Sequence, residues 1–107
     1  MKYRHLGNSG LEVSVIGLGT NNFGGRMEFK EAREVIFAAI DEGINFIDTA
    51  NIYSHGNSEE IIGEITQGKR DQLFIATKFS PENHEYTKVI QSAERSMKRL
   101  RTDYIDL

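Results

Sequence analysis

Short apolar runs alternate with amphipathic stretches along most of this chain. Three runs, residues 15–19, 44–48 and 73–78, are nearly continuously apolar, which indicates buried strands. Between the first two, apolar residues recur at helical spacing and predict a helix over residues 29–42 that ends before Gly43. The residues that set this spacing are Ala32, Val35, Ile36, Ala39 and Ile40.

The same alternation continues to the end of the sequence. Asn57 or Ser58 is suited to cap a short helix with three isoleucines and two acidic residues in its first turn. A longer helix is expected over residues 86–101, and residues 104–107 begin a fourth strand. The isoleucines are Ile61, Ile62 and Ile65, and the acidic residues are Glu59 and Glu60.

Strands joined by helices define the expected fold class, which is α/β. Near-continuous apolar strands with helical connections indicate a parallel sheet that is buried on both faces. Ahead of it, residues 2–14 alternate on either side of a turn-forming cluster at residues 7–10 and predict a β-hairpin.

Composition narrows the setting. The 107 residues, 38% of them hydrophobic, are typical of a soluble globular chain of at most one domain, and no run is apolar enough to span a membrane. The absence of cysteine excludes disulfides and thiolate metal sites. The polar amino terminus has no apolar core of signal-peptide length, so we expect a cytoplasmic protein.

The charges are nearly balanced. Thirteen basic and sixteen acidic residues give a net charge of -3, which does not favour a nucleic-acid partner. The one basic cluster, Lys98, Arg99 and Arg101, is interpreted as the solvated face of the last predicted helix. The apolar residues of that helix are Val89, Ala93, Met97 and Leu100.

Candidate chemistry lies where two strands end. Asp48 and Lys78 each close an apolar strand, and the carboxyl ends of neighbouring parallel strands lie about 4.8 Å apart. An ion pair between them is therefore expected. Tyr53 follows in the loop after Asp48, and a lysine cation beside a phenol, whose ordinary pKa is about 10, favours the phenolate. The trio predicts an acid–base device in which Tyr53 exchanges a proton, Lys78 tunes it and Asp48 holds Lys78.

Two other interpretations of these residues stay open at this point. A charged residue that ends a strand is often only a solvated terminus. A lone lysine at a strand end is also a candidate Schiff-base nucleophile, which would make the protein a lyase acting through Lys78.

Four separated motifs, in order, carry a family resemblance. They are "YRHLGNSGLEVSVIGLGT" at residues 3–20, "DTANIYSHGNSE" at 48–59, "IATK" at 75–78 and "SMKRLRTDYIDL" at 96–107. The chain resembles the aldo-keto reductases over its whole length. The resemblance implies a (β/α)8 barrel that binds NADP(H), or less often NAD(H), without a metal, and that reduces small carbonyl compounds or oxidises alcohols.

The family's functional residues carry over position by position. The catalytic tyrosine corresponds to Tyr53, the aspartate to Asp48 and the lysine to Lys78. Gly19, Thr20, Asn21 and Asp48 are positioned to touch the nicotinamide end of the coenzyme. The family's catalytic histidine lies a few residues beyond the segment that matches "DYIDL", so no residue here corresponds to it.

Length sets the expected domain organisation. A barrel needs on the order of 250 residues, so residues 1–107 are expected to be an incomplete barrel, with the hairpin at about 2–14 and βα units up to the start of the fourth strand. Such a piece is expected to be inactive alone. The alternative from a different class is an inactive fragment or a barrel-derived interaction module.

Other candidates are weaker. His5, His55 and His84 are too scattered for a metal site, although His55 lies beside Tyr53. The glycine-rich residues 17–25 lack the spacing of a dinucleotide loop and a Walker lysine. Ser54 stands where the family loop usually has glycine, so we expect a changed loop conformation. Asp106 is either a buried structural carboxylate or a support for the rim.

Overall fold

The computed structural model describes all 107 residues and contains two small sheets and three α-helices. The helices are α1 (Phe29–Asp41), α2 (Asn57–Ile65) and α3 (Tyr86–Leu100). The strands are β1 (Tyr3–His5), β2 (Glu12–Ser14), β3 (Leu18–Gly19), β4 (Phe46–Asp48) and β5 (Phe74–Ala76), and the short 3-10 turns are η1 (Tyr53–Gly56), η2 (Arg70–Gln72) and η3 (Pro81–Asn83). None of the helices has the length and apolar character needed to cross a membrane.

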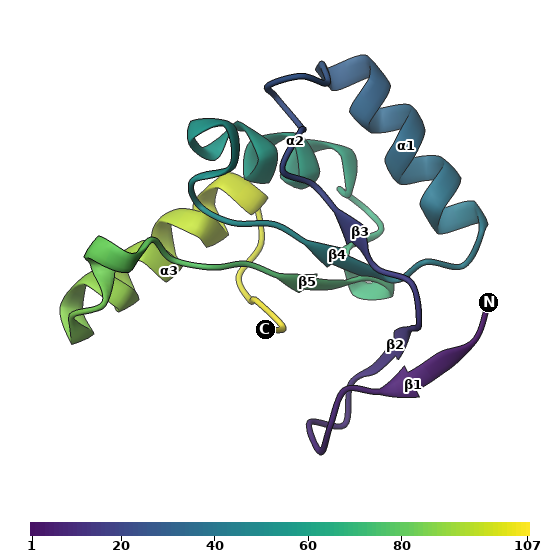
Figure 1. The fold of residues 1–107 in the computed structure, drawn as a ribbon, viewed down its shortest axis with the longest axis horizontal. Coiled ribbons are helices and arrows are strands. Elements are labelled where there is room, and N and C mark those ends of the chain that lie inside the picture. Colours follow the sequence, from purple (N-terminus) through teal and green to yellow (C-terminus); the bar gives the residue numbers. More distant parts are fainter.

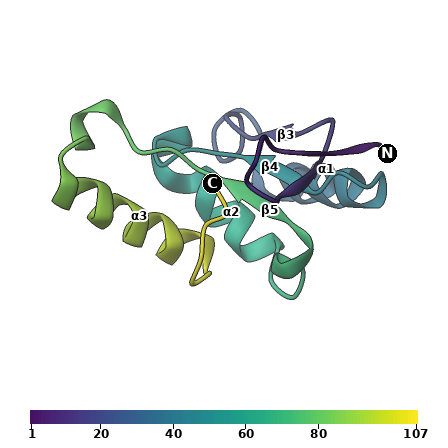
Figure 2. The same ribbon diagram turned by 90° about the horizontal axis from the view of Figure 1, so that it is seen from below.

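The predicted parallel sheet is confirmed, with the order β3-β4-β5. Gly19 is in register with Asp48, and Asp48 with Ala76, so the carboxyl ends of the three strands lie side by side. Figures 1 and 2 show that the three helices cover the same face of this sheet. The core fills the space between them and consists of Phe23, Ala32, Ile36, Ile47, Ile62, Ile65, Leu73, Ile75 and Leu100.

The predicted hairpin is formed by β1 and β2 and is fixed to the start of β4. Its strands pair antiparallel. The Tyr3 hydroxyl donates to the Gly43 carbonyl at 2.8 Å, and the Ser14 amide donates to the Asn45 side chain at 2.7 Å. Gly43 itself has a φ of +84°, which lets it end α1 where the sequence predicted. The hairpin therefore lies below the amino ends of the strands, away from the rim where they end (Figure 1).

Two expectations about strand burial are wrong. Within residues 15–19 only β3 joins the parallel sheet, because the chain bends at Val15 and Ile16, which remain 48% and 56% exposed. The sheet is also covered on one face only. Side chains alternate along a strand, so Ile47 and Ile75 face the helices, while Phe46 and Phe74 face the opposite side and are half-buried.

The predicted fourth strand lies along β5 without forming a regular strand. The Thr77 amide donates to the Leu107 carbonyl at 2.9 Å, so the segment follows the edge of β5. The Ile75 amide, however, donates to the Asp106 carboxylate at 2.9 Å. Because a side chain takes this donor, the backbone ladder is interrupted at the Ile75 amide, while the Ile75 carbonyl still accepts from the Asp106 and Leu107 amides at 3.3 Å.

Candidate active site

Asp48 and Lys78 meet at the rim as the sequence predicted. Asp48 is the last residue of β4, and backbone pairing continues past the strand ends, where the Asn51 amide donates to the Lys78 carbonyl at 3.0 Å. The Lys78 ammonium donates at 2.7 Å to the Asp48 carboxylate and at 2.7 Å to the Thr49 carbonyl. Both charged side chains are about half exposed, so the rim lies open to small molecules.

Tyr53 folds over the same rim from the first position of η1. Its ring centroid lies 5.2 Å from the Lys78 ammonium. The loop is tied down because the Ser80 hydroxyl donates to the Asn51 side chain at 3.0 Å. The three residues predicted to form an acid–base device therefore share one patch at the carboxyl ends of β4 and β5.

The loop after Tyr53 adopts an uncommon backbone. Ser54, His55 and Gly56 have φ values of +50°, +56° and +95°, in the left-handed region that glycine enters most easily. Ser54 thus takes a conformation that suits a glycine, and a change of loop conformation relative to the family stays a prediction. A methylene at Gly25 would lie 2.9 Å from the Ser54 hydroxyl, so the loop packs closely on the segment after β3.

The surroundings of Lys78 hold it in the charged form. Partial burial by itself lowers the pKa of Lys78, but the hydrogen bond to Asp48 and the charge of that carboxylate outweigh it. With a smaller contribution from Tyr53, they raise the pKa above the ordinary 10.5. At neutral pH the rim therefore presents a fixed ammonium next to a phenol.

The residues expected at the nicotinamide end differ in their exposure. Gly19 is exposed next to Asp48, and a side chain at this position would meet no atom within 4 Å, so the space above it is open. Asn21 is also exposed. Thr20, in contrast, is 1% exposed, and its hydroxyl donates to the Asp48 carbonyl at 2.9 Å. Its side chain lies below the rim and supports it.

Sequence reasoning missed a buried ion pair beneath the site. Glu59 was expected to be a helix-dipole residue in the first turn of α2, yet its side chain is 0% exposed and pairs with Arg99 at 2.6 Å. The interpretation of Arg99 as part of a solvated face is therefore wrong. Its side chain is only 23% exposed, and it lies on the same side of α3 as the buried Ser96, three residues earlier. One sequence signal could have indicated this burial. Glu59 lies three residues before Ile62 and four before Gly63, which places it on the buried face of α2.

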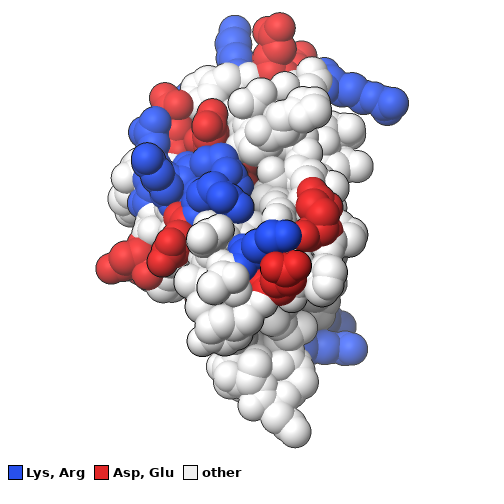
Figure 3. Space-filling model, turned by 90° about the vertical axis from the view of Figure 1, so that its left-hand side faces the viewer, with Lys and Arg blue, Asp and Glu red and all other residues white.

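The charged face over α3 is mixed in sign. Figure 3 shows acidic side chains next to the basic ones on this side of the molecule. Arg101 lies 3.9 Å from Glu64, and together with Glu60, Lys98 and Arg99 these two residues line an open hollow of about 410 Å³. The cluster is thus partly neutralised by carboxylates.

The remaining candidates form no further site. No three His, Asp or Glu side chains are arranged to hold a metal ion. His84 contacts the Pro81 carbonyl through Nδ1 at 2.8 Å, and His55 is exposed. Asp106 is structural, since its carboxylate accepts from Arg70 at 2.7 Å and from the Ile75 amide.

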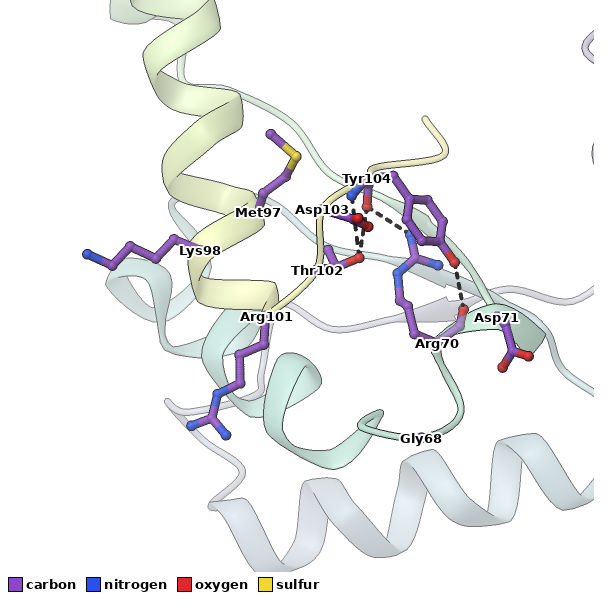
Figure 4. A pocket seen from close by; sticks show the side chains of 9 residues that line it. All are labelled: Gly68, Arg70, Asp71, Met97, Lys98, Arg101, Thr102, Asp103 and Tyr104. Carbon is purple, nitrogen blue, oxygen red and sulfur yellow. Dashed lines mark hydrogen bonds between the residues drawn. The ribbon is translucent and has the colours of Figure 1, made fainter.

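The largest hollow, about 670 Å³, lies at the amino end of β5 and not at the rim (Figure 4). Arg70 is one of the charged residues that line it, and the Tyr104 ring stacks on the guanidinium at 3.9 Å. Because the Arg70 guanidinium also donates to the Asp106 carboxylate and the Leu73 carbonyl, its charge is paired within the fold and does not point to a ligand site. We therefore place the candidate active site at Asp48, Tyr53 and Lys78.

Comparison with known proteins defines the class. The model of the aldo/keto reductase family matches residues 15–107, so this chain belongs to that family. It is 43% identical to the aldo-keto reductase YhdN of Bacillus subtilis (strain 168), over 100% of this chain and 37% of that protein. The chain therefore spans well under half the length of this relative and corresponds to its amino-terminal part.

Solved structures agree on the fold. The thermostable aldo-keto reductase Tm1743, solved in complex with the inhibitor epalrestat, superposes with a TM-score of 0.90 at 37% identity and covers 98% of this chain and 40% of that one. An aldo-keto reductase from Klebsiella pneumoniae in complex with NADPH gives a TM-score of 0.79 at 36% identity, over 89% and 34%. The fold is the amino-terminal part of a (β/α)8 barrel.

Proposed function

We propose that the chain is the amino-terminal part of an NADP(H)-dependent aldo-keto reductase that interconverts small carbonyl compounds and alcohols. The observation that carries this proposal is the double hydrogen bond of Lys78 to Asp48 and Thr49 under the ring of Tyr53. We call the longer protein that contains this chain the parent enzyme. The expected incomplete barrel at residues 1–107, its inactivity alone and the cytoplasmic location stay predictions.

The rim fits a nicotinamide coenzyme. The Klebsiella pneumoniae relative was solved with NADPH. In this chain the open space above Gly19 lets a flat ring approach the Asp48 carboxylate, a space that a side chain would fill. Gly19, Asn21 and Asp48 would contact the bound coenzyme, and Thr20 would act from below. When bound, NADPH supplies a hydride to the carbonyl carbon.

The residues of this chain supply the proton that accompanies hydride transfer. As the carbonyl oxygen gains negative charge, Tyr53 donates its phenolic proton to it. The neighbouring Lys78 ammonium stabilises the phenolate that remains. Asp48 and the Thr49 carbonyl hold that ammonium in place, so the acid is preorganised. Alcohol oxidation runs the same steps in reverse, with the phenolate as base.

The lyase alternative is disfavoured by the state of Lys78. A Schiff-base lysine must attack as the neutral amine. Here the pKa of Lys78 is raised by Asp48, and two acceptors occupy its protons. Binding of NADPH to the parent enzyme, followed by fluorescence, and its oxidation with a reactive aldehyde test the reductase. Trapping of a carbonyl substrate on Lys78 by borohydride, without need of coenzyme, would instead favour the lyase.

The interaction-module alternative is favoured by exposed apolar side chains. Val15, Ile16 and Phe79 lie open on this chain. A parent protein that binds no nicotinamide coenzyme but captures a protein partner through these residues would support this second function.

A further inference from the structure

A threonine follows the end of each parallel strand. Thr20 comes directly after β3, Thr49 after β4 and Thr77 after β5. Each is adjacent in sequence to a residue of the candidate site, namely Gly19, Asp48 and Lys78. Thr20 and Thr49 are buried and Thr77 is half-buried, so the three hydroxyls lie under the rim.

Ser58, at the start of α2, joins the first two threonines. The Thr49 and Ser58 hydroxyls lie 3.0 Å apart, and the Ser58 hydroxyl lies within 3.0 Å of both the carbonyl and the hydroxyl of Thr20. Thr20 in turn donates to the Asp48 carbonyl. The hydrogen bonds therefore run from the end of β4 through α2 to the end of β3 and back to the residue that holds Lys78.

Glu59, the next residue, joins the third threonine. One carboxylate oxygen accepts from the Thr77 hydroxyl at 2.6 Å, and the other accepts from the Arg99 guanidinium at 2.6 Å. Arg99 balances the charge of a fully buried carboxylate, which would otherwise be strongly unfavourable. One turn of α2 thus holds the ends of all three strands.

We propose that Ser58 and Glu59 are positioning residues that set the distance between the Asp48 carboxylate and the Lys78 ammonium through the strand-end threonines. The effect of this positioning on catalysis rests on the reductase function proposed above. The effect of Ser58 and Glu59 on the distance between Asp48 and Lys78 does not depend on that function. The Lys78 ammonium is bound at 2.7 Å by both the Asp48 carboxylate and the Thr49 carbonyl, so a shift of β5 against β4 would lengthen two hydrogen bonds at once.

Thr77→Val is the direct test, in the parent enzyme. It keeps the β-branched shape and removes the hydroxyl that Glu59 holds. We expect kcat to fall by about 10-fold to 10²-fold, with the Kd for NADPH unchanged. An NMR titration of the lysine ε-carbons should show the pKa of Lys78 moving down, because the contact with Asp48 loosens. Thr77→Ser should restore both values.

Thr66→Val is the matched control. Thr66 is more deeply buried than Thr77, at 1% exposed, but its hydroxyl donates only to the Ile62 carbonyl of the helix it caps, at 2.8 Å. This variant should lose thermal stability without change in kcat or in the titration of Lys78. Ser58→Ala provides a second test of the same inference through the other two threonines, should Thr77→Val not fold.

The titration decides the inference whatever the activity. A downward shift of the pKa of Lys78 in Thr77→Val or Ser58→Ala, absent in Thr66→Val, supports the positioning role even in a protein that reduces no carbonyl, which would overturn the reductase function alone. A pKa of Lys78 equal to that of the unsubstituted protein in folded Thr77→Val or Ser58→Ala overturns the positioning role.

Discussion

The Lys78 ammonium lies 2.7 Å from the carboxylate of Asp48, 30 residues earlier and on the neighbouring strand. It donates equally closely to the Thr49 carbonyl, so two acceptors from the end of β4 define its place. A lysine held in this way has little freedom to reach a substrate itself. The group that lies next to this ammonium is the ring of Tyr53, whose centroid is 5.2 Å away.

Replacing the phenol tests the proton donor. In the parent enzyme, Tyr53→Phe should lower the rate of carbonyl reduction by at least roughly 10²-fold, as for loss of a general acid. NADPH affinity, measured by fluorescence, should survive because the ring still packs on the loop. Near-normal turnover would mean that Tyr53 is only a packing group.

Lys78→Met should act through the same proton. An uncharged neighbour no longer stabilises the phenolate, so reduction slows. Combined with Tyr53→Phe, it should cost much less than the product of the two separate effects, because both changes disable one device. Steady-state kinetics of the single and double variants measure this, and full additivity would show that the two residues act independently.

The ion pair predicts a dependence on alkaline pH. Because the folded-state pKa of Lys78 is raised above 10.5, its contribution to stability is complete below that value and is lost as pH rises through the folded-state pKa. The effect should be modest, since both side chains are about half exposed. Urea unfolding of the parent enzyme at neutral and strongly alkaline pH should show a smaller loss of stability in Asp48→Asn than in the unsubstituted protein. Equal losses would contradict the pairing.

The left-handed loop after Tyr53 predicts opposite effects of two glycine exchanges. Ser54→Gly relieves a strained φ of +50° and should change stability by no more than about 1 kcal/mol, in the stabilising direction. Gly56→Ala should destabilise, because it forces a side chain at a φ of +95° against the Arg99 side chain at 3.0 Å. Thermal unfolding of both variants of the parent enzyme checks the signs. Destabilisation by Ser54→Gly would show that the Ser54 side chain makes a contact worth more than the strain.

The 107-residue chain by itself should associate. One face of its sheet has no helix, and Val15, Ile16 and Phe79 are exposed. Hydrophobic-dye binding and light scattering measure the outcome. A monodisperse monomer with a cooperative thermal transition would contradict it.

The sequence predicted the pairing of Asp48 with Lys78 because both residues end apolar runs, and parallel order places strand ends together. It did not predict that Val15 and Ile16 are exposed, since an apolar run does not reveal where the chain bends before a strand begins. Glu59 and Arg99 were missed for a different reason. Charged residues are usually at the surface, and only the partner from another helix makes it possible to bury one.

The attachment of the hairpin has a consequence for synthesis on the ribosome. Its anchors are the Gly43 carbonyl, 40 residues after its partner Tyr3, and the Asn45 side chain, 31 residues after its partner Ser14. The two hairpin strands are synthesised before these anchors and therefore have no docking surface until α1 has been completed and β4 has begun. We expect the hairpin to dock late among the early events of co-translational folding, after the first helix has packed.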